Sequence, residues 1–125
     1  MFCIPITNTA LAVIKDREYL SRGDCESGLM PLIKKVFGVA GDYVSMNNFG
    51  VNVNNDFRVI NSKPILVDVE GRNLPLIKNG FIKKGYYLLL SDYNERSFDS
   101  RYFGTIERSN ILYNVKPLMV IGDSR

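Results

Sequence analysis

Short apolar segments separated by turn residues make up most of this chain, and few show the 3.6-residue period of a helix. From residue 41 onward the pattern predicts strands at residues 43–46, 49–53, 57–60, 65–69, 85–90, 105–107, 111–115 and 118–121. The pairs Asn47-Asn48 and Asn54-Asn55 separate neighbouring strands, and asparagine tolerates the positive φ of tight hairpin turns. We therefore expect an all-β protein whose mainly antiparallel sheet is folded on itself.

The first forty residues predict the remaining elements. Residues 1–6 are apolar and contain Pro5, which favours an edge strand. Residues 9–20 suit a short helix capped by Asn8 or Thr9. Residues 31–39 form an apolar strand interrupted by two lysines. With no internal repeat or linker, residues 1–125 are expected to form one domain with at most one or two short helices.

Composition restricts the chemistry that the chain can perform. It contains no histidine, which excludes Ser-His-Asp triads, Cys-His dyads and zinc sites that need imidazole. Its two cysteines lack a C-x-x-C spacing, so we expect no metal and no cofactor. The net charge is +3 and the basic residues are scattered, which gives no basis for nucleic-acid binding. Hydrolytic chemistry would have to use lysine, carboxylates and hydroxyls.

Two adjacent lysines lie in the predicted strand at residues 31–39. Because side chains alternate along a strand, Lys34 shares a face with Leu32 and Val36, while Lys35 lies on the opposite face. Both faces are otherwise apolar, so at least one amine should approach a low-dielectric environment. Desolvation lowers the pKa of lysine from about 10.4, and a neutral lysine is a competent general base. The alternative is that both lysines lay their stems on apolar neighbours and keep their amines in water.

A second unusual stretch, residues 91–104, follows the predicted buried strand and concentrates hydroxyls, carboxylates and arginines. In an extended chain Ser97, Asp99 and Arg101 would point the same way. Asp99 and Arg101 can form an ion pair, and a serine beside them can hydrogen-bond a neutral amine. The alternative is a polar turn that the Asp–Arg pair merely holds in place.

Both stretches resemble motifs of signal peptidases. Residues 34–44, KKVFGVAGDYV, resemble the family's lysine box, K-[RK]-x-x-G-x-x-G-D-x-V. Residues 91–104, which begin SD and end SFDSRYFG, resemble its C-terminal box, [SG]-D…S-x-D-S-R-Y-[FW]-G. Residues 2–5, 22–25 and 97–104 are most similar to the TraF-type branch that acts in conjugative transfer. The resemblance covers nearly the whole chain.

The resemblance implies a serine peptidase with a Ser/Lys dyad in a β-rich fold. Lys34 would be the general base, and Ser97 would hydrogen-bond and orient its amine. Asp99 and Arg101 would brace the loop, with Asp92 a weaker candidate for the same role. Residues Pro31, Leu32 and Ile33 would pair with an extended substrate by β-strand addition. In the TraF branch the substrates are pilin precursors, which are trimmed and joined head to tail.

The nucleophile of such a peptidase stands upstream of the lysine, in an S-x-P or S-M-x-P phrase that follows a membrane anchor. Ser21 and Ser27 precede Lys34 without that context. We therefore expect the nucleophile, its oxyanion donor and the inner-membrane anchor to lie upstream of these 125 residues, and this chain alone to be inactive.

The implied location is the periplasmic face of the bacterial inner membrane. That compartment is oxidising, so we expect a disulfide between Cys3 and Cys25. Two buried unpaired cysteines are the alternative.

Two other function classes compete with the peptidase. One is a non-enzymatic β-barrel binding or assembly module of a secretion or conjugation apparatus, in which the two boxes serve folding. The other is a small nucleic-acid-binding barrel that stacks bases on tyrosine and phenylalanine. The latter needs a basic groove lined by aromatic side chains, and no segment interleaves the two residue types well.

Overall fold

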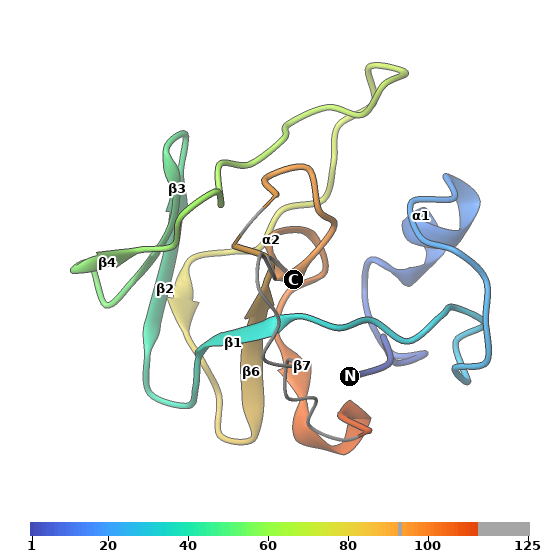
Figure 1. The fold of residues 1–125 in the computed structure, drawn as a ribbon, viewed down its shortest axis with the longest axis horizontal. Helices are drawn as coiled ribbons and strands as arrows, with labels where there is room; N and C mark the ends of the chain where they lie inside the picture. The colour runs from blue at the N-terminus through green and yellow to red at the C-terminus, as the bar shows by residue number, and fades with distance from the viewer. Residues whose placement is uncertain (93, 113–125) are drawn as a thin grey trace, which may run out of the picture.

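The computed structural model describes residues 1–92 and 94–112, which form two antiparallel sheets with two short α-helices (Figure 1). One sheet has the strand order β1-β6-β7 and the other has the order β4-β3-β2-β5. In chain order the elements are α1 (Leu11–Asp16), β1 (Lys35–Gly38), β2 (Tyr43–Asn47), β3 (Gly50–Val53), β4 (Phe57–Arg58), β5 (Gly80–Phe81), β6 (Tyr86–Leu90), α2 (Ser100–Phe103), β7 (Ile106–Glu107) and the 3-10 turn η1 (Arg108–Asn110). This architecture confirms the mainly antiparallel all-β class.

Strand β6 separates two apolar cores. Leu88 and Leu90 pack into one core, while Leu89 packs into the other, because successive side chains of a strand point to opposite faces. Figure 1 shows α1 on one side of the β1-β6-β7 sheet and strands β2, β3 and β4 on the other. Burial on both faces explains why this strand reads as a continuous apolar run. The first core also contains Phe2, Ile4, Ala10, Ile14, Leu29, Phe103 and Ile106, and the second contains Val44, Val51, Val53, Val59 and Ile82.

The pairing of β1 with β6 fixes the position of the two lysines. Lys35 pairs with Leu90 and Val36 pairs with Leu89, after which the register shifts before Gly38. Gly38 is buried, and its position allows β1 to lie close to the second core. A Cβ placed on Gly38 would lie 2.7 Å from Ile82 Cδ1 and 3.2 Å from Leu88 Cβ.

We expect Gly38→Ala to destabilise the fold, because the added methyl overlaps Ile82 and Leu88. Overpacking of this kind costs about 1–3 kcal/mol. The matched control is Gly80→Ala, since a Cβ at Gly80 meets nothing within 4 Å. Urea unfolding of both variants measures the difference. Equal unfolding midpoints would show that the approach of β1 to the second core is looser than described.

The hairpin of β2 and β3 lies where the sequence predicted two neighbouring strands, at residues 43–46 and 49–53. Its register runs from Val44 opposite Val53 to Asn47 opposite Gly50. At the following turn Asn54 and Asn55 have φ of 58° and 62°. This is the left-handed conformation that asparagine tolerates better than most residues.

Three expectations require correction. Phe2 bridges both Leu32 and Ile111, so the first segment has partners on both sides and is no edge strand. Helix α1 covers only residues 11–16, and Asn8 Oδ1 accepts from Ala10 N–H at 2.9 Å just before it. Residues 65–69 form a single bridge, Val67 to Asn73, instead of a strand. The short helix α2 was not predicted. The expected strand at 118–121, and the end of that at 111–115, lie outside the described residues.

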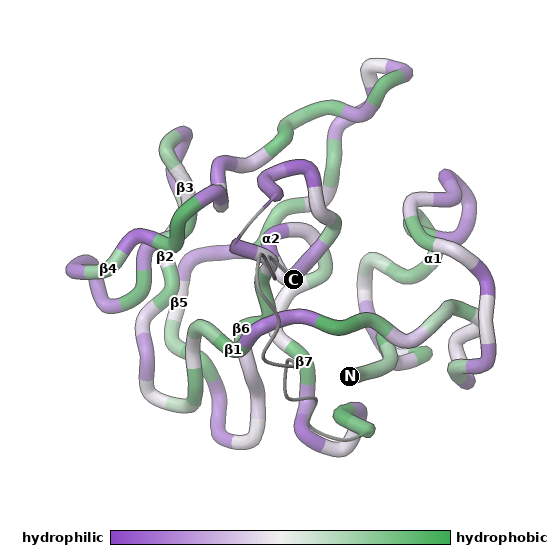
Figure 2. Tube along the Cα trace, in the orientation of Figure 1, coloured by the Kyte–Doolittle hydropathy of each residue, from purple (hydrophilic) through white to green (hydrophobic). Residues whose placement is uncertain are grey.

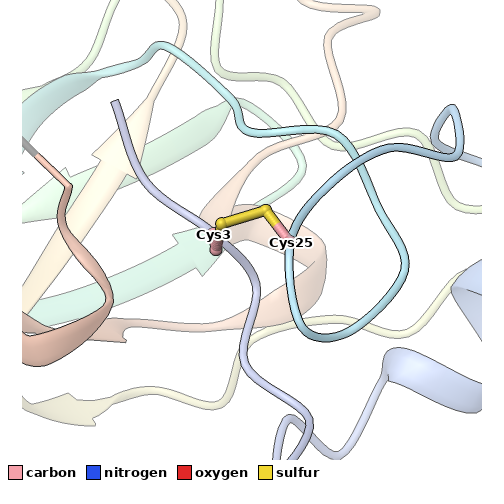
Figure 3. The surroundings of a disulfide bond; sticks show 2 residues. All are labelled: Cys3 and Cys25. Atoms are coloured by element: carbon pink, nitrogen blue, oxygen red, sulfur yellow. A yellow bond between two sulfur atoms is a disulfide. The ribbon is translucent and has the colours of Figure 1, made fainter.

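A disulfide joins Cys3 to Cys25, with an S–S distance of 2.02 Å. Figure 3 shows that it connects the amino-terminal segment to the loop that follows α1. It closes a loop of 22 residues, which in the chain-entropy model is worth about 3 kcal/mol.

None of the helices within residues 1–92 and 94–112 combines the length and apolar character needed to cross a membrane.

Candidate active site

Lys34 lies immediately before β1, on the wall of a groove of about 370 Å³. Figure 2 shows the hydrophilic lysine pair flanked on both sides by hydrophobic chain. Val36 and Leu89 share the groove wall with Lys34, so most of the surroundings are apolar. The complete lining is Met1, Phe2, Ile33, Lys34, Lys35, Val36, Leu89 and Ile111.

The environment of Lys34 favours its neutral form. Burial lowers the pKa of the Lys34 amine below its ordinary value, and this is the largest effect. The negative charge of Asp99 opposes the shift, and the positive charge of Arg101 adds to it. A lysine whose pKa is lowered is unprotonated more often near neutral pH, so it can accept a proton.

Lys35 has a different environment, as the alternation of the strand predicts. Its Nζ lies 3.2 Å from Asp92 Oδ2 in a solvent-exposed ion pair. The Asp92 carbonyl accepts from the Asn61 side-chain amide at 2.9 Å. Asp92 therefore ties the end of β6 both to the lysine strand and to the segment of Asn61.

Asp99 and Arg101 are fully buried and paired with each other. Arg101 Nε and Nη2 donate to the two oxygens of the Asp99 carboxylate at 2.8 and 3.2 Å. The guanidinium also donates to the carbonyls of Lys63, Glu95 and Ser97 at 2.7, 2.8 and 2.6 Å. All three guanidinium nitrogens are thus satisfied, and one side chain joins two chain segments, one at Lys63 and the other at residues 95–99.

The extended conformation expected for Ser97 to Arg101 is wrong. Asp99 instead caps α2, and its Oδ1 accepts from the Arg101 N–H at 3.0 Å. The Asp99 carboxylate reaches Arg101 through the geometry of a helix start, not across an extended strand. An aspartate before a short polar-aromatic run is an N-cap signal, and it could have indicated the helix.

Ser97 is held by its main chain. Its N–H donates to the Asn94 carbonyl at 3.1 Å, and its carbonyl accepts from Arg101. Within residues 1–92 and 94–112 no hydrogen bond joins Ser97 to the Lys34 amine. The structure therefore brings Lys34 into electrostatic reach of Asp99 and Arg101, while Ser97 belongs to the loop that Arg101 holds.

Residues 31–33 border the groove. Leu32 uses both main-chain groups to pair with Phe2, at 2.8 and 2.9 Å. The main-chain N–H and carbonyl of Ile33 point the other way, and in the described part of the chain they make no hydrogen bond. The Ile33 side chain lines the groove and is 53% exposed. Ile33 therefore has main-chain groups without a partner beside Lys34 in the described part of the chain, while Pro31 and Leu32 lie outside the groove lining.

Sequence reasoning missed the hydroxyls that hold the C-terminal box (residues 91–104) against the sheet. Ser100 Oγ accepts from the Leu89 N–H at 2.9 Å, and Tyr102 Oη accepts from the Ile65 N–H at 2.9 Å. The Ser91 N–H donates to Asp99 Oδ2 at 3.2 Å, while the Ser91 side chain is buried. Local patterns give no signal for these bonds, because their partners are distant in sequence.

The geometry describes a β-sheet domain that holds a half-buried lysine amine on the wall of a mostly apolar groove. Residues 5–119 match the family model for signal peptidase, peptidase S26. The plasmid transfer protein TraF of Escherichia coli is 34% identical over 121 residues, which cover 95% of this chain and 67% of that protein. The probable conjugal transfer protein TraF of Sinorhizobium fredii is 37% identical over 113 residues, covering 90% of this chain and 58% of that protein.

A signal peptidase I from Enterococcus faecalis is 17% identical, with a TM-score of 0.45, over 77% of this chain and the whole of that chain. The sequence matches establish the relationship. This chain belongs to the signal peptidase S26 family, and within it to the TraF-type proteins. It spans between about 56% and 67% of the length of the TraF relatives it matches.

Proposed function

We propose that this chain is the catalytic core of a Ser/Lys-dyad endopeptidase that processes a pilin precursor during conjugative transfer. The observation that carries the proposal is the half-buried Lys34 amine, whose pKa is lowered by burial at the wall of an apolar groove. Membership of a peptidase family supports the reaction class, and the TraF relatives, which are named as conjugal transfer proteins, support the process.

In the proposed reaction the neutral Lys34 amine removes the proton of a serine hydroxyl as its oxygen attacks the scissile carbonyl. The resulting ammonium then returns a proton to the leaving amine of the substrate. Water hydrolyses the acyl-enzyme, or the amino terminus of the precursor attacks it, which would join the peptide head to tail. Asp99 and Arg101 hold the loop that faces the amine, and Ser97 lies within that loop as its proposed orienting hydroxyl.

The nucleophilic serine is proposed to come from a segment outside the groove lining described above, which contains no serine. Ser21 lines a different pocket, together with Lys15 and Tyr19. Ser27 Oγ is buried two residues after Cys25 of the disulfide. Neither serine reaches the groove of Lys34.

The substrate is proposed to add as a strand to residues 31–33, using the unpaired main-chain groups of Ile33. Its side chains before the scissile bond would enter the groove, whose mostly apolar lining suits apolar residues. A location on the periplasmic face of the inner membrane, reached through an anchor, suits an exported substrate. The Cys3–Cys25 disulfide supports an oxidising compartment.

A precursor-processing gel tests the proposal with three samples. These are the 125-residue chain, a longer chain that carries an S-x-P segment before it, and the longer chain with that serine changed to alanine. We expect cleavage by the longer chain alone. Cleavage by the 125-residue chain would mean that one of its own serines is the nucleophile. If no sample cleaves while all bind the precursor, the protein is a binding module and the proposal fails.

A further inference from the structure

Ser91 is a buried hydroxyl that the proposed mechanism leaves unused. It is 5% exposed, and within the described chain its Oγ has no hydrogen-bond partner. A buried hydroxyl without a partner is costly, so its position calls for a functional reason or an unseen partner. Only Ser27 Oγ shares this condition among the described residues, and it lies two residues after Cys25, away from the groove of Lys34.

The register of β1 and β6, continued by one step beyond the last pair of the ladder, sets Ser91 opposite Lys34. Lys35 pairs with Leu90 and Val36 pairs with Leu89, so one further step sets Lys34 against Ser91. Opposite residues of an antiparallel pair carry their side chains on the same face. The face is that of Val36 and Leu89, which line the groove together with Lys34.

The hydrogen bonds of β6 show which kind of pair this is. The Leu89 N–H donates to Ser100 and the Ser91 N–H donates to Asp99, so both point away from β1. Lys34 and Ser91 therefore occupy a non-hydrogen-bonded site, where opposite Cα atoms are about 4.5 Å apart and side chains are closest. A lysine stem at such a site passes directly over its cross-strand neighbour.

We infer that Ser91 Oγ, which has no partner in the described chain, becomes a hydrogen-bond partner of the Lys34 amine once the site of the complete protein is assembled, and that it acts as a positioning residue for the proposed base. The contact would give the buried hydroxyl its partner and would hold the amine over the end of β6. The inference rests on the proposed function and adds a second hydroxyl to the Ser97 assignment. Because Ser91 is buried, its hydroxyl cannot act as the nucleophile that attacks a substrate carbonyl.

Several charged groups lie near the Lys34 amine, and a pH experiment on Ser91 must leave them unchanged. Asp99 and Arg101 act on Lys34 from the C-terminal box, and Met1, whose amino group has a pKa lowered by burial, lines the same groove. The pair of Lys35 and Asp92 lies at the surface. None of these groups is altered by removing a neutral hydroxyl, so the change isolates the contribution of Ser91.

The test compares Ser91→Ala, Ser91→Thr and the control Ser27→Ala in the complete, cleaving protein. An oxygen that accepts from an ammonium stabilises the charged form, so its loss should lower the pKa of Lys34 further and move the acid limb of the kcat profile to lower pH. Loss of orientation should reduce plateau kcat about tenfold with KM unchanged. Ser91→Thr keeps the hydroxyl and should keep the wild-type limb, as should Ser27→Ala.

An unmoved limb and unchanged kcat in Ser91→Ala would overturn the inference and leave the proposed function intact, provided Lys34→Ala is inactive. Activity that does not depend on Lys34 would instead overturn the proposed function. If Ser91→Ala does not fold, a crystal structure of the unaltered protein decides. An Oγ–Nζ distance within hydrogen-bonding range supports the inference, and a separation beyond about 4 Å contradicts it.

Discussion

Lys34→Ala should reduce precursor cleavage by the complete protein by about a thousandfold or more, because it removes the side chain that is proposed to take the proton of the nucleophile. The described groove contains one further lysine, Lys35, and its amine is occupied by Asp92 at the surface. Single-turnover cleavage at saturating precursor measures the chemical step without a contribution from substrate binding.

Lys34→Arg separates a proton-accepting role from a role of charge alone. A guanidinium stays protonated in proteins, so this variant should be as inactive as Lys34→Ala although it keeps the positive charge. The control is Lys84→Ala, which removes a solvent-exposed amine from the other lysine pair of the chain and should cleave like the unaltered protein. Substantial cleavage by Lys34→Arg would contradict the role of Lys34 as a base.

Asp99→Ala should cause the largest loss of stability among single changes in the C-terminal box. It leaves the Arg101 guanidinium buried without its charge partner, and breaking a buried pair in this way costs about 3–5 kcal/mol. It also removes the cap of α2 and the acceptor of the Ser91 N–H. Urea unfolding, followed by circular dichroism and tyrosine fluorescence, gives the change in the free energy of unfolding.

Asp92→Ala is the matched control, because it also removes a carboxylate that pairs with a cation. The partner of Asp92 is the exposed Lys35, and exposed pairs contribute at most about 1 kcal/mol. If Asp99→Ala and Asp92→Ala lower stability equally, Asp99 does not brace the loop as described. Should Asp99→Ala fail to fold, Asp99→Asn keeps the shape and the cap and should show a smaller loss.

The sequence predicted the elements whose burial is visible in the local pattern of apolar and polar residues. Strand β6 reads as a continuous apolar run because both of its faces are buried, and the two lysines separate because a strand alternates. The two boxes also predicted which charged residues would gather, since Lys34, Asp99 and Arg101 do lie within electrostatic reach.

The parts that sequence reasoning missed depend on partners distant in the chain. Helix α2 has only four residues, and its conformation is supported by the Ser100 bond to Leu89 and the Arg101 carbonyl bond to Ile77. Residues 65–69 have strand-forming side chains, yet Val69 is completely exposed and only Val67 bridges a partner. The same limit applies to Ser91, whose position opposite Lys34 follows from register and not from composition.

The lowered pKa of Lys34 also predicts how stability depends on pH. The folded state binds fewer protons than the unfolded state between the lowered pKa and about 10.4, so stability should rise with pH across that window. Below the window both states are protonated, and the folded state carries the full cost of the buried charge. Lys34→Met should remove this slope, which unfolding midpoints at a series of pH values would show.

The most direct test of the account is a titration of the lysine amines of this chain by nuclear magnetic resonance, with each signal assigned by single Lys→Arg variants. The account predicts that the Lys34 amine loses its proton below the ordinary lysine pKa of about 10.4, since burial is the largest influence on it. A Lys34 amine that titrates at that ordinary value would contradict the claim that this lysine serves as the base.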